Sequence, residues 1–337
     1  MERPKVCVLM STYNGEKYIR EQIDSVLSQK GINVQLVIRD DESTDNTIKI
    51  IDEYTKEYHN ISYYKGTNIG VGKSFLNLLM DAPEADYYAF ADHDDVWLED
   101  KLKQAVEFIN KEKSNYDLAI QKNNTLKSEI SNELNNLEKR KSIPLLYGSN
   151  QTLVDKNLNI IRKRFFKNPN LDLIGLVSKN VVSGCTMVMN NELRREIINY
   201  SGLVSDNTIK LRLHDTWCMM VAAIKGKILY DENSYILYRQ HDGNVVGAKQ
   251  KTFVEKCNNK VNRFKTQKYK GVRSNIAKEL LVIFNNDLRD EDKIELHIIA
   301  DCNSLRGGIE LCKNEKIVKL FREKKSILLL KAIFGWI

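Results

Sequence analysis

The first hundred residues alternate short apolar runs with segments whose apolar residues recur at helical spacing. The runs, typical of strands buried on both faces of a sheet, are residues 6–10, 34–38, 61–64 and 87–91. The intervening segments predict helices over 16–29, 72–80 and 99–110. A further helix, which carries Ile48, Ile51 and Tyr54, is predicted after a cap at Ser43 or Asp45. Strands separated by helices of this length predict βαβ units, and therefore an α/β fold with a mostly parallel central sheet.

This alternation breaks at residues 112–142, which are rich in Asn, Lys, Glu and Ser. The apolar residues that remain there at helical spacing, which predict an inserted amphipathic helix, are Leu126, Ile130, Leu134 and Leu137. Strand-like patterns return near 145–147 and 186–189, and after about residue 247 the pattern becomes helical. We therefore expect an α/β domain over 1–247 and a helical C-terminal region over 248–337.

The C-terminal region is basic. From residue 246 onward the chain carries 20 Lys and Arg against 11 Asp and Glu, whereas the whole chain has a formal charge of +7. The final segment, 317–337, combines basic and apolar residues, namely Lys319, Arg322, Lys324, Lys325 and Lys331 with Leu328, Leu329, Leu330, Phe334 and Trp336. Such a segment suits the headgroup region of an anionic membrane or a diphosphate-linked acceptor. The alternative is an ordinary basic helix pair that packs its apolar face on the core.

The composition excludes several classes of protein. With 42% apolar residues, 29% charged residues and four prolines, the chain resembles a globular protein rather than a disordered one. It has no uncharged apolar stretch of about 18 residues and no signal-peptide pattern at its start. Its six cysteines are scattered without a CxxC pair, which is typical of reduced core thiols. We expect a cytoplasmic protein, with a peripheral position on the inner face of the plasma membrane as the alternative.

Each of the first four predicted strands ends in a polar cluster. The clusters are residues 11–16, 40–45, 68–70 and 92–95. A single cluster of this kind is often only a helix cap. Because ligands bind at the carboxyl ends of the strands in open α/β sheets, four clusters together predict one binding site.

The acidic run ADHDDVW at residues 91–97 carries the clearest chemistry. Three acids within four residues, directly after an apolar strand, are electrostatically costly unless a cation compensates them. Carboxylate oxygens suit Mg²⁺ or Mn²⁺, and diphosphate oxygens would complete an octahedral shell. The run therefore predicts a divalent metal that offsets the charge of a leaving diphosphate. The alternative is a set of acids solvated at a strand end.

Seven motifs in this order resemble glycosyltransferase family 2, and most closely its bacterial polysaccharide branch of rhamnosyltransferases: MSTYNGEKYI, RDDESTDNT, NIGVGKSF, ADHDDVW, GCTM, HDTW and YRQHDGN. The resemblance covers about residues 5–247. It implies the GT-A fold, a Rossmann-like nucleotide-sugar-binding fold, and inverting, metal-dependent sugar transfer to an acceptor hydroxyl with Mn²⁺ or Mg²⁺. The donor it implies is dTDP-L-rhamnose, with a UDP-hexose or UDP-N-acetylhexosamine as the alternative. The implied acceptor is a polysaccharide or a lipid-linked oligosaccharide, and no nucleic-acid partner is expected.

The resemblance and the strand-end clusters together assign site residues. The nucleotide-sugar-binding set is Thr12, Tyr13, Asn14, Glu16, Asp40, Asp41, Asn68, Gly70, Lys73, Asp92 and His93. The metal ligands are Asp94, Asp92 and His241, although His241 could instead be a surface-loop histidine. The acceptor or sugar pocket contains Gly184, Cys185, Thr186, His214 and Trp217, with a plain turn as the alternative for Gly184. His93 stands where this branch usually has Gln, and residues 112–142 have no counterpart in it.

An inverting transfer needs a carboxylate on the face of the donor sugar opposite the diphosphate. Asp92 and Asp94 are expected at the metal, and Asp40 and Asp41 at the nucleoside. Asp215 remains, at the start of a predicted helix behind residues 183–186, and we predict that it is the general base. A helix cap is the alternative role for this residue. A neighbouring apolar wall, such as Trp217, would raise its basicity.

Two other functions compete with this prediction. Residues 66–74 resemble a phosphate-binding P-loop, but five residues instead of four separate Gly66 from Gly72, so the spacing excludes that motif. A catalytically inactive nucleotide-sugar-binding module would keep the fold without turnover. The acids at positions 92, 94 and 215 argue for an active enzyme.

Overall fold

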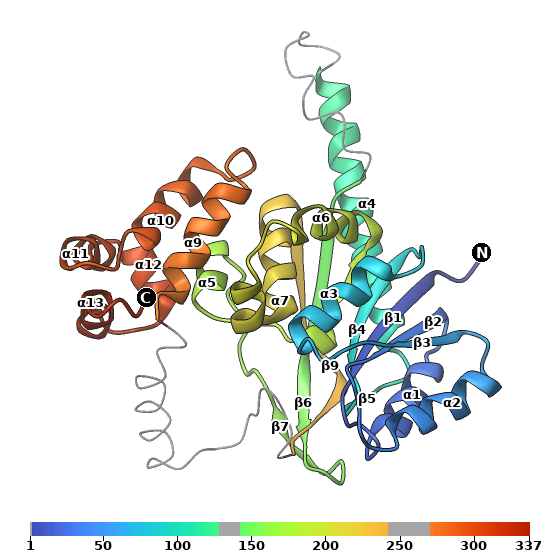
Figure 1. Cartoon of the computed structure of the whole chain (residues 1–337). Helices are drawn as coiled ribbons and strands as arrows, with labels where there is room; N and C mark the ends of the chain where they lie inside the picture. The colour runs from blue at the N-terminus through green and yellow to red at the C-terminus, as the bar shows by residue number, and fades with distance from the viewer. Residues whose placement is uncertain (1, 128–141, 242–269) are drawn as a thin grey trace.

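The computed structural model describes residues 2–127, 142–241 and 270–337. Its centre is one curled, mostly parallel nine-stranded sheet (Figure 1). In sheet order the strands are β3 (Ile61–Lys65), β2 (Asn33–Asp40), β1 (Lys5–Thr12), β4 (Tyr87–Asp92), β8 (Val188–Asn190), β6 (Leu145–Val154), β9 (Lys227–Arg239) and β5 (Val96–Trp97), with β7 (Ile160–Lys163) paired to β6. The four strands predicted from the N-terminal apolar runs are confirmed.

The register of the parallel strands aligns their polar ends. Strand β1 lies between β2 and β4, with Thr12 opposite Asp40 and Ser11 opposite Asp92. Strands β6 and β9 also run parallel, whereas β8 joins the two halves through antiparallel pairing with β4 and β6. The first, second and fourth polar clusters of the sequence therefore meet at one edge of the sheet.

Helices cover both faces of the sheet, which explains why its central strands β1 and β4 carry continuous apolar runs. In β1, Val6 and Val8 belong to one hydrophobic cluster and Cys7 and Leu9 to the other, because successive side chains of a strand point to opposite faces. The first face is covered by α1 (Ile19–Leu27), α2 (Thr47–Glu57) and α4 (Lys101–Lys127). The second face is covered by α3 (Val71–Asp81), α6 (Asn191–Ser201) and α7 (Asp206–Lys225).

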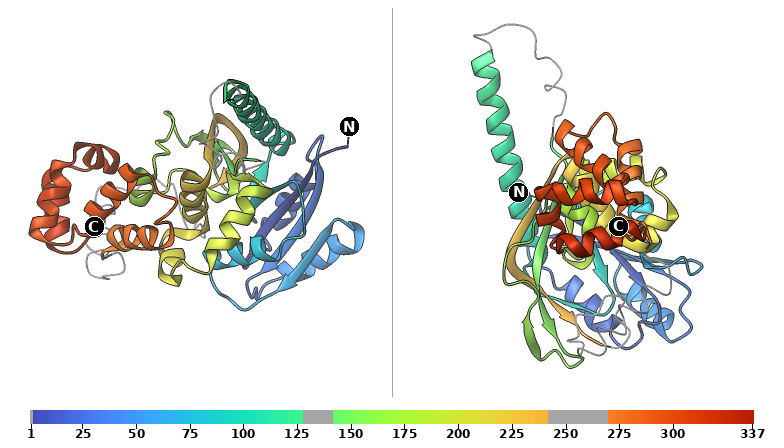
Figure 2. Two further views of the ribbon diagram at one scale, coloured as in Figure 1. Left: turned by 90° about the horizontal axis from the view of Figure 1, so that it is seen from above. Right: turned by 90° about the vertical axis from the view of Figure 1, so that its left-hand side faces the viewer.

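The C-terminal helices form a group at one end of the molecule (Figures 1 and 2). They are α9 (Val272–Ile283), α10 (Asp290–Ala300), α11 (Leu305–Lys313), α12 (Glu315–Phe321) and α13 (Lys325–Ile333). Their buried side chains join the same hydrophobic cluster as α5 (Leu173–Ser178) and α7. The ring of Phe284, for example, lies 5.9 Å from that of Trp217. The described part of this region is thus helical, as predicted, and packs on the α/β core.

The final basic segment is two helices rather than one, because Arg322 adopts a left-handed backbone conformation (φ 54°) that ends α12. In α13, Leu328 and Ala332 are fully buried, so one face packs on the core. Ile327, Leu330 and Phe334 remain 46%, 56% and 63% exposed. Core packing therefore accounts for only one side of this helix. Within the described ranges, no helix is both long and apolar enough to cross a bilayer.

Two local predictions are corrected by the structure. The helix predicted over 99–110 continues to Lys127 as α4, so residue 112 is not an element boundary; Lys, Glu and Gln are good helix formers even where the apolar face ends. The remainder of the predicted inserted helix, at 128–141, lies outside the described residues. Neither predicted residue is the N-cap of α2, which is Asn46 and makes no side-chain capping bond. Ser43 Oγ accepts from the amide of Asn14 (2.8 Å), and Asp45, one residue further from the helix, accepts at Oδ1 from the amide of Thr47 (3.0 Å).

Candidate active site

Three acids crowd together after β4. Asp92 ends the strand, and the ligand atoms of Asp92, Asp95 and Cys185 lie within 4.8 Å of one another. Burial, and then the charges of Asp94 and Asp215, raise the pKa of Asp92 to about 7. Burial and the charges of Asp94 and Asp92 raise the pKa of Asp95 well above its usual value. The buried amine of Lys101 interacts with the charge of Asp95, but burial lowers the pKa of Lys101 to about 7. The described residues therefore supply less positive charge here than full ionisation of the acids would require.

Asp94 meets His241, which lies 147 positions further along the chain, just beyond β9. Asp94 Oδ2 and His241 Nε2 are 2.8 Å apart, and Asp94 is 9% exposed. Burial opposes ionisation of Asp94, but the hydrogen bond from His241 and the neighbouring positive charge hold the pKa of Asp94 below its usual value. Asp94 and His241 therefore form a carboxylate–imidazole pair, whereas the three ligand atoms that lie within 4.8 Å of one another are those of Asp92, Asp95 and Cys185. The metal site of Asp92, Asp94 and His241 stays a prediction. This donor set and the surplus of buried acid fit a divalent cation.

The turn that carries these acids is held by Arg239, which sequence reasoning did not select. The backbone amide of Arg239 donates to Asp95 Oδ1 (3.0 Å), and its Nε donates to the carbonyl oxygen of Asp94 (2.9 Å). Its guanidinium is 1% exposed and also pairs with Glu21. Both Asp95 and Arg239 lie inside recognised motifs, so their positions were visible but their structural role was not.

Asp215 is presented by a kink in α7. Leu213 interrupts the helix at φ 66° and ψ 169°, a region of backbone space that is almost confined to glycine. The helix resumes beyond the kink, where Asp215 Oδ2 accepts from Asn180 Nδ2 (2.5 Å) and Oδ1 accepts from the amide of Thr216 (2.7 Å). An N-cap would accept from the second or third amide of the helix, so this pattern does not favour capping. Burial raises the pKa of Asp215 to about 6.

His214 and Gly184 pack against each other beside Asp215. The His214 ring stacks on Phe75 (4.2 Å between centroids) and meets Phe90 edge-on (4.8 Å), and burial lowers the pKa of His214 to about 3. A Cβ added at Gly184 would lie 2.5 Å from His214 Nε2. Close approach does require glycine at position 184, but the group that approaches is His214 rather than a sugar.

The other predicted pocket residues are mainly structural. Trp217 lies in the hydrophobic core against Phe284, and it does not form the apolar wall predicted beside Asp215. The reason is helical phase, since residues two positions apart on a helix do not face each other. Cys185 is 1% exposed and accepts from Gln151 Nε2 (3.1 Å). The hydroxyl of Thr186 donates to the carbonyl oxygen of Ser183 (2.8 Å).

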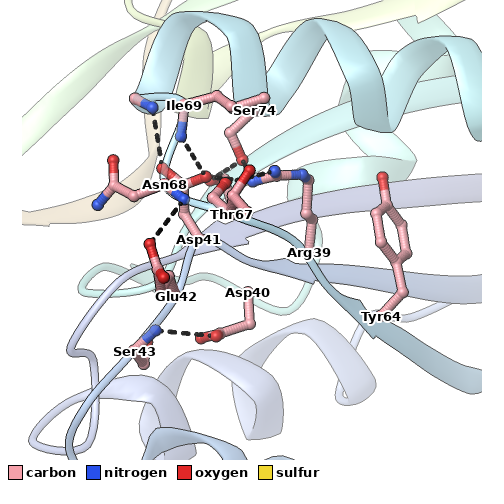
Figure 3. A network of polar contacts seen from close by, with 12 residues as sticks. Arg39, Asp40, Asp41, Glu42, Ser43, Tyr64, Thr67, Asn68, Ile69 and Ser74 are labelled. Atoms are coloured by element: carbon pink, nitrogen blue, oxygen red, sulfur yellow. Dashed lines mark hydrogen bonds and ion pairs between the residues drawn. The ribbon is translucent and has the colours of Figure 1, made fainter.

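At the end of β2, a buried network fixes the loop between β3 and α3 (Figure 3). Arg39 pairs with Asp41 and also donates to Ser74 Oγ and to the carbonyl oxygen of Thr67, at 3.0 Å each. The Asp41 carboxylate accepts from the amides of Ile69 (3.1 Å) and Gly70 (3.0 Å). Amides that a P-loop would offer to phosphate are thus bound to an acid here. The nucleoside contact predicted for Asp41 is replaced by internal bonds that shape the loop.

Asp40 differs from Asp41 because one of its carboxylate oxygens has no hydrogen-bond partner among the described residues. Oδ2 accepts from the amide of Ser43 (2.9 Å), whereas Oδ1 is buried without a hydrogen-bond partner in the described chain. The hydroxyl of Thr12, opposite Asp40 in the sheet, is also buried without such a partner. Unpaired buried acceptors are costly, so these two atoms suit a ligand that supplies hydrogen-bond donors.

The remaining residues predicted at the nucleotide site link two neighbouring loops by hydrogen bonds. Asn14, at φ 49°, accepts from the amide of Thr44 (2.8 Å), and Glu16 accepts from the amide of Asn46 (2.9 Å). Tyr13 is 48% exposed. His93 lies against the loop, since a Cβ added at Gly15 would be 2.6 Å from His93 Cδ2.

Two predicted residues follow the third strand. The amide of Asn68 donates to Glu42 Oε2 (3.1 Å), and Gly70, at φ 81°, is the N-cap residue that precedes α3. Lys73 pairs with Asp206 in the first turn of α7. The structure therefore brings Asn68 and Gly70 to the Asp41 loop, whereas the ammonium group of Lys73 is engaged by a neighbouring helix.

Arg164, which follows β7, is a site residue that no motif indicated. Its Nη1 donates to Gln151 Oε1 (2.6 Å) and to Ser183 Oγ (2.5 Å), and the guanidinium carbon lies 5.9 Å from the Tyr238 ring centroid. Its charge partly opposes the rise that burial causes in the pKa of Asp215. The only sequence signal was a short basic run, so its approach to the site became visible only in three dimensions.

Comparison with known proteins fits this geometry. The profile of the family described as Glycosyl transferase family 2 matches residues 7–171. The chain is 31% identical over 249 residues to the dTDP-rhamnosyl transferase RfbG of Shigella flexneri, covering 71% of this chain and 74% of that protein. It is 35% identical over 108 residues to the putative teichuronic acid biosynthesis glycosyltransferase TuaG of Bacillus subtilis, covering 32% and 42% of the two chains.

Among solved structures, S. aureus TarS 1–349 in complex with UDP-GlcNAc resembles the chain with a TM-score of 0.54 at 18% identity, covering 98% of this chain and 89% of that one. At such identity the likeness speaks for the GT-A fold alone. The rhamnosyl transferase relative, aligned over most of both chains, shows the family. This chain belongs to glycosyltransferase family 2, and the protein is a glycosyltransferase.

Proposed function

We propose that the protein transfers L-rhamnose from dTDP-L-rhamnose, with inversion, to a hydroxyl of a polysaccharide or lipid-linked oligosaccharide. The observation that carries the proposal is Asp215, a buried carboxylate that is separate from the Asp94–His241 pair and close enough to raise the pKa of Asp92. The donor is supported by the relative that is named a dTDP-rhamnosyl transferase. A UDP-N-acetylhexosamine is the second candidate, because the TarS structure of the same fold holds UDP-GlcNAc.

In this proposal Asp215 accepts the proton of the acceptor hydroxyl as that oxygen bonds to the anomeric carbon. The bond from the anomeric carbon to the diphosphate oxygen breaks in the same displacement, and the nucleoside diphosphate leaves. Asp92, Asp94 and His241 would hold Mg²⁺ or Mn²⁺, which when bound offsets the charge of the leaving diphosphate. Asp40 and Thr12 offer buried acceptor oxygens to the nucleoside. Asn180 orients the base by donating to it.

The organisation of the chain forms part of the proposal. Residues 1–247 would make up the catalytic domain, and residues 248–337 a basic helical region that lies against it. The exposed Ile327, Leu330 and Phe334 of the last helical segment, next to the exposed Lys324 and Lys325, support a peripheral contact with the inner face of the plasma membrane. This contact would keep the enzyme near a lipid-linked acceptor.

A donor screen tests the proposal. Nucleotide release is measured with dTDP-L-rhamnose, UDP-glucose and UDP-N-acetylglucosamine, each with and without a divalent metal and a glycan acceptor. We expect acceptor-dependent release of dTDP that is lost in chelator. Faster release of UDP would identify a UDP-sugar as the donor. Full activity in chelator would reject the metal requirement. Calorimetric binding of dTDP or UDP, without turnover on any acceptor, would indicate an inactive binding module.

A further inference from the structure

The segment that leaves the outer edge of the sheet, residues 160–167, is both basic and apolar. Its sequence, IIRKRFFK, has four basic residues and no acid. Three of its apolar side chains face solvent: Ile160 is 73% exposed, Ile161 54% and Phe166 80%. Soluble monomers rarely expose large apolar side chains as a contiguous patch unless they bind something there. We call residues 160–167 the β7 edge.

The β7 edge lies at the rim of the fold. Among the strands of the described residues, β7 pairs with β6 alone, off the main path of the sheet (Figure 1). The register shifts at its start, where Val154 faces Ile160 and Leu153 faces Arg162, so that Ile161 is an extra residue. Such a bulge interrupts the regular alternation of side chains in the strand, and here both adjacent isoleucines are exposed.

The same segment reaches the catalytic site. Arg164 extends inward to Gln151 and Ser183. Ser183 precedes Gly184, whose backbone lies against Asp215; a Cβ added at Gly184 would be 3.5 Å from Asp215 Cβ. Two contacts therefore connect the β7 edge to the candidate base, namely Arg164 with Ser183 and Gly184 with Asp215. We expect a surface that binds the β7 edge to lie next to this part of the site.

The basic side chains of the β7 edge are not neutralised from within. Arg162 donates to the carbonyl oxygens of Lys163 (2.9 Å) and Arg164 (3.1 Å), and no ion pair joins Arg162, Lys163 or Lys167 to an acid of the described ranges. A second copy of this edge would bring like charges together, which disfavours self-association. Exposed apolar groups beside unpaired cations suit a surface that is anionic outside and apolar beneath.

We propose that the β7 edge rests on the surface of an anionic phospholipid membrane. Phe166 and the two isoleucines enter the headgroup boundary, and Lys163 and Lys167 face lipid phosphates. The membrane then presents a lipid-linked acceptor to the Asp215 side of the site. This last consequence rests on the proposed function, whereas membrane binding itself does not.

Vesicle co-sedimentation of the full chain tests the contact. The parent should pellet with vesicles of phosphatidylcholine and phosphatidylglycerol, and much less with phosphatidylcholine alone. In Lys163→Gln/Lys167→Gln, the partition coefficient should fall about fivefold for each lysine removed, the equivalent of about 1 kcal/mol per basic residue at an anionic surface. Phe166→Ser should also weaken binding. Melting temperatures should not change, because these side chains are exposed.

Two matched variants show where the contact lies. Val282→Ser removes an equally exposed apolar side chain (81%) from α9, and Phe334→Ser removes an exposed ring (63%) beyond α13. Val282→Ser should pellet like the parent. Phe334→Ser lies in the C-terminal contact proposed above and should weaken pelleting, and the β7-edge variants should weaken it independently of that change. If Phe334→Ser loses binding while the β7-edge variants keep it, the membrane contact belongs to the C-terminal helices and the proposal is rejected. Sedimentation of the protein without vesicles, abolished by Phe166→Ser, would instead identify a second copy as the partner.

Activity separates this proposal from the proposed function. With a water-soluble saccharide acceptor, Lys163→Gln/Lys167→Gln should release nucleotide at the parental rate. With a lipid-linked acceptor embedded in anionic vesicles, its rate should fall together with its binding. If no acceptor supports turnover of the parent, the proposed function fails while the vesicle result stands. If Lys163→Gln/Lys167→Gln, Phe166→Ser and the parent bind vesicles equally, the proposed membrane contact of the β7 edge is rejected, whereas the transferase function is unaffected.

Discussion

Buried charge is handled in opposite ways at the ends of β2 and β4, which lie on either side of β1. At the end of β2, Arg39 neutralises Asp41, and amides of the following loop take up the remaining carboxylate capacity. At the end of β4, Asp92 and Asp95 are crowded by other acids, and their pKa values are raised. The first region is complete within the chain, whereas the second is, in the proposed function, incomplete until a cation binds. We therefore expect the first region to serve as scaffold and the second as reactive site.

The largest effect is expected for a substitution in the incomplete region at the end of β4. Asp94→Ala removes a charged oxygen ligand, so turnover should fall to the level of the chelator-treated parent and added Mn²⁺ should not restore it. Nucleotide release, measured over a metal titration, checks this. Asp290→Ala, at a side chain that is 99% exposed, is the matched control and should behave like the parent. Metal-dependent turnover in Asp94→Ala would place the metal elsewhere.

Replacing the candidate base comes next. Asp215→Asn keeps the shape of the side chain but cannot take up a proton, so kcat should fall about 10²–10⁴-fold. Nucleotide affinity should change little, and any loss of melting temperature should be small beside the loss of kcat, because the amide keeps one of the two acceptor oxygens that serve Asn180 and Thr216. All three are to be measured on one preparation. A cap residue would show the reverse pattern, and turnover within a few-fold of the parent would eliminate Asp215 as the base.

The scaffold region should respond in stability instead. Arg39→Met leaves Asp41 charged and buried, which typically costs about 3–5 kcal/mol of folding free energy. Arg20→Met breaks an ion pair whose side chains are 49% and 47% exposed, and should cost no more than about 1 kcal/mol. Urea unfolding of both variants measures the difference. Equal losses would mean that the Arg39–Asp41 network does not stabilise the loop as its burial implies.

A smaller effect is expected for His241→Ala. The variant keeps the Asp94 carboxylate but loses the imidazole that lies 2.8 Å from it. We expect the metal concentration for half-maximal activity to rise about 10–100-fold, by analogy with the loss of groups that support metal ligands, with activity recovering at saturating metal. An unchanged metal titration would assign His241 to the surface loop instead.

The pH dependence gives the mildest test. Because burial raises the pKa of Asp215 to about 6, its base form is lost below that pH, and kcat/KM should fall about tenfold per pH unit there. The raised pKa also means that the protonated form is favoured by folding, so this carboxyl stabilises the fold at low pH. That contribution is lost as the pH rises from about 4, its unfolded value, to about 6. The melting-temperature difference between the parent and Asp215→Asn should follow this change.

Most of the sheet could be predicted because strands buried on both faces leave continuous apolar runs, and β1, β2 and β4 are such strands. The length of α4 could not, since its second half has no apolar stripe to mark it. Helical phase alone would have excluded Trp217 from the neighbourhood of Asp215. The proximity of Asp94 to His241 was predicted only from resemblance, because no local pattern links residues 147 positions apart.

The residues that sequence reasoning missed have contacts without a local signature. Arg164 and Asn180 lie in irregular segments, and their partners, Ser183 and Asp215, are set by how β6 and α7 pack. Asp41 shows the opposite kind of error in the sequence prediction. It was found, but its role was assigned to the ligand because a sequence does not show whether a carboxylate is already satisfied by its own chain.

The kink at Leu213 bears on how this enzyme could be improved or could evolve. A leucine in a region of backbone space that is almost confined to glycine costs about 1–3 kcal/mol, more than the roughly 0.5–1 kcal/mol that glycine loses in conformational entropy. Selection for thermal resistance alone would therefore favour Leu213→Gly. The same change would free the backbone that carries His214 and Asp215. Position 213 is thus where heat tolerance and turnover should trade against each other, and a screen that scores only survival on heating would select against the catalyst.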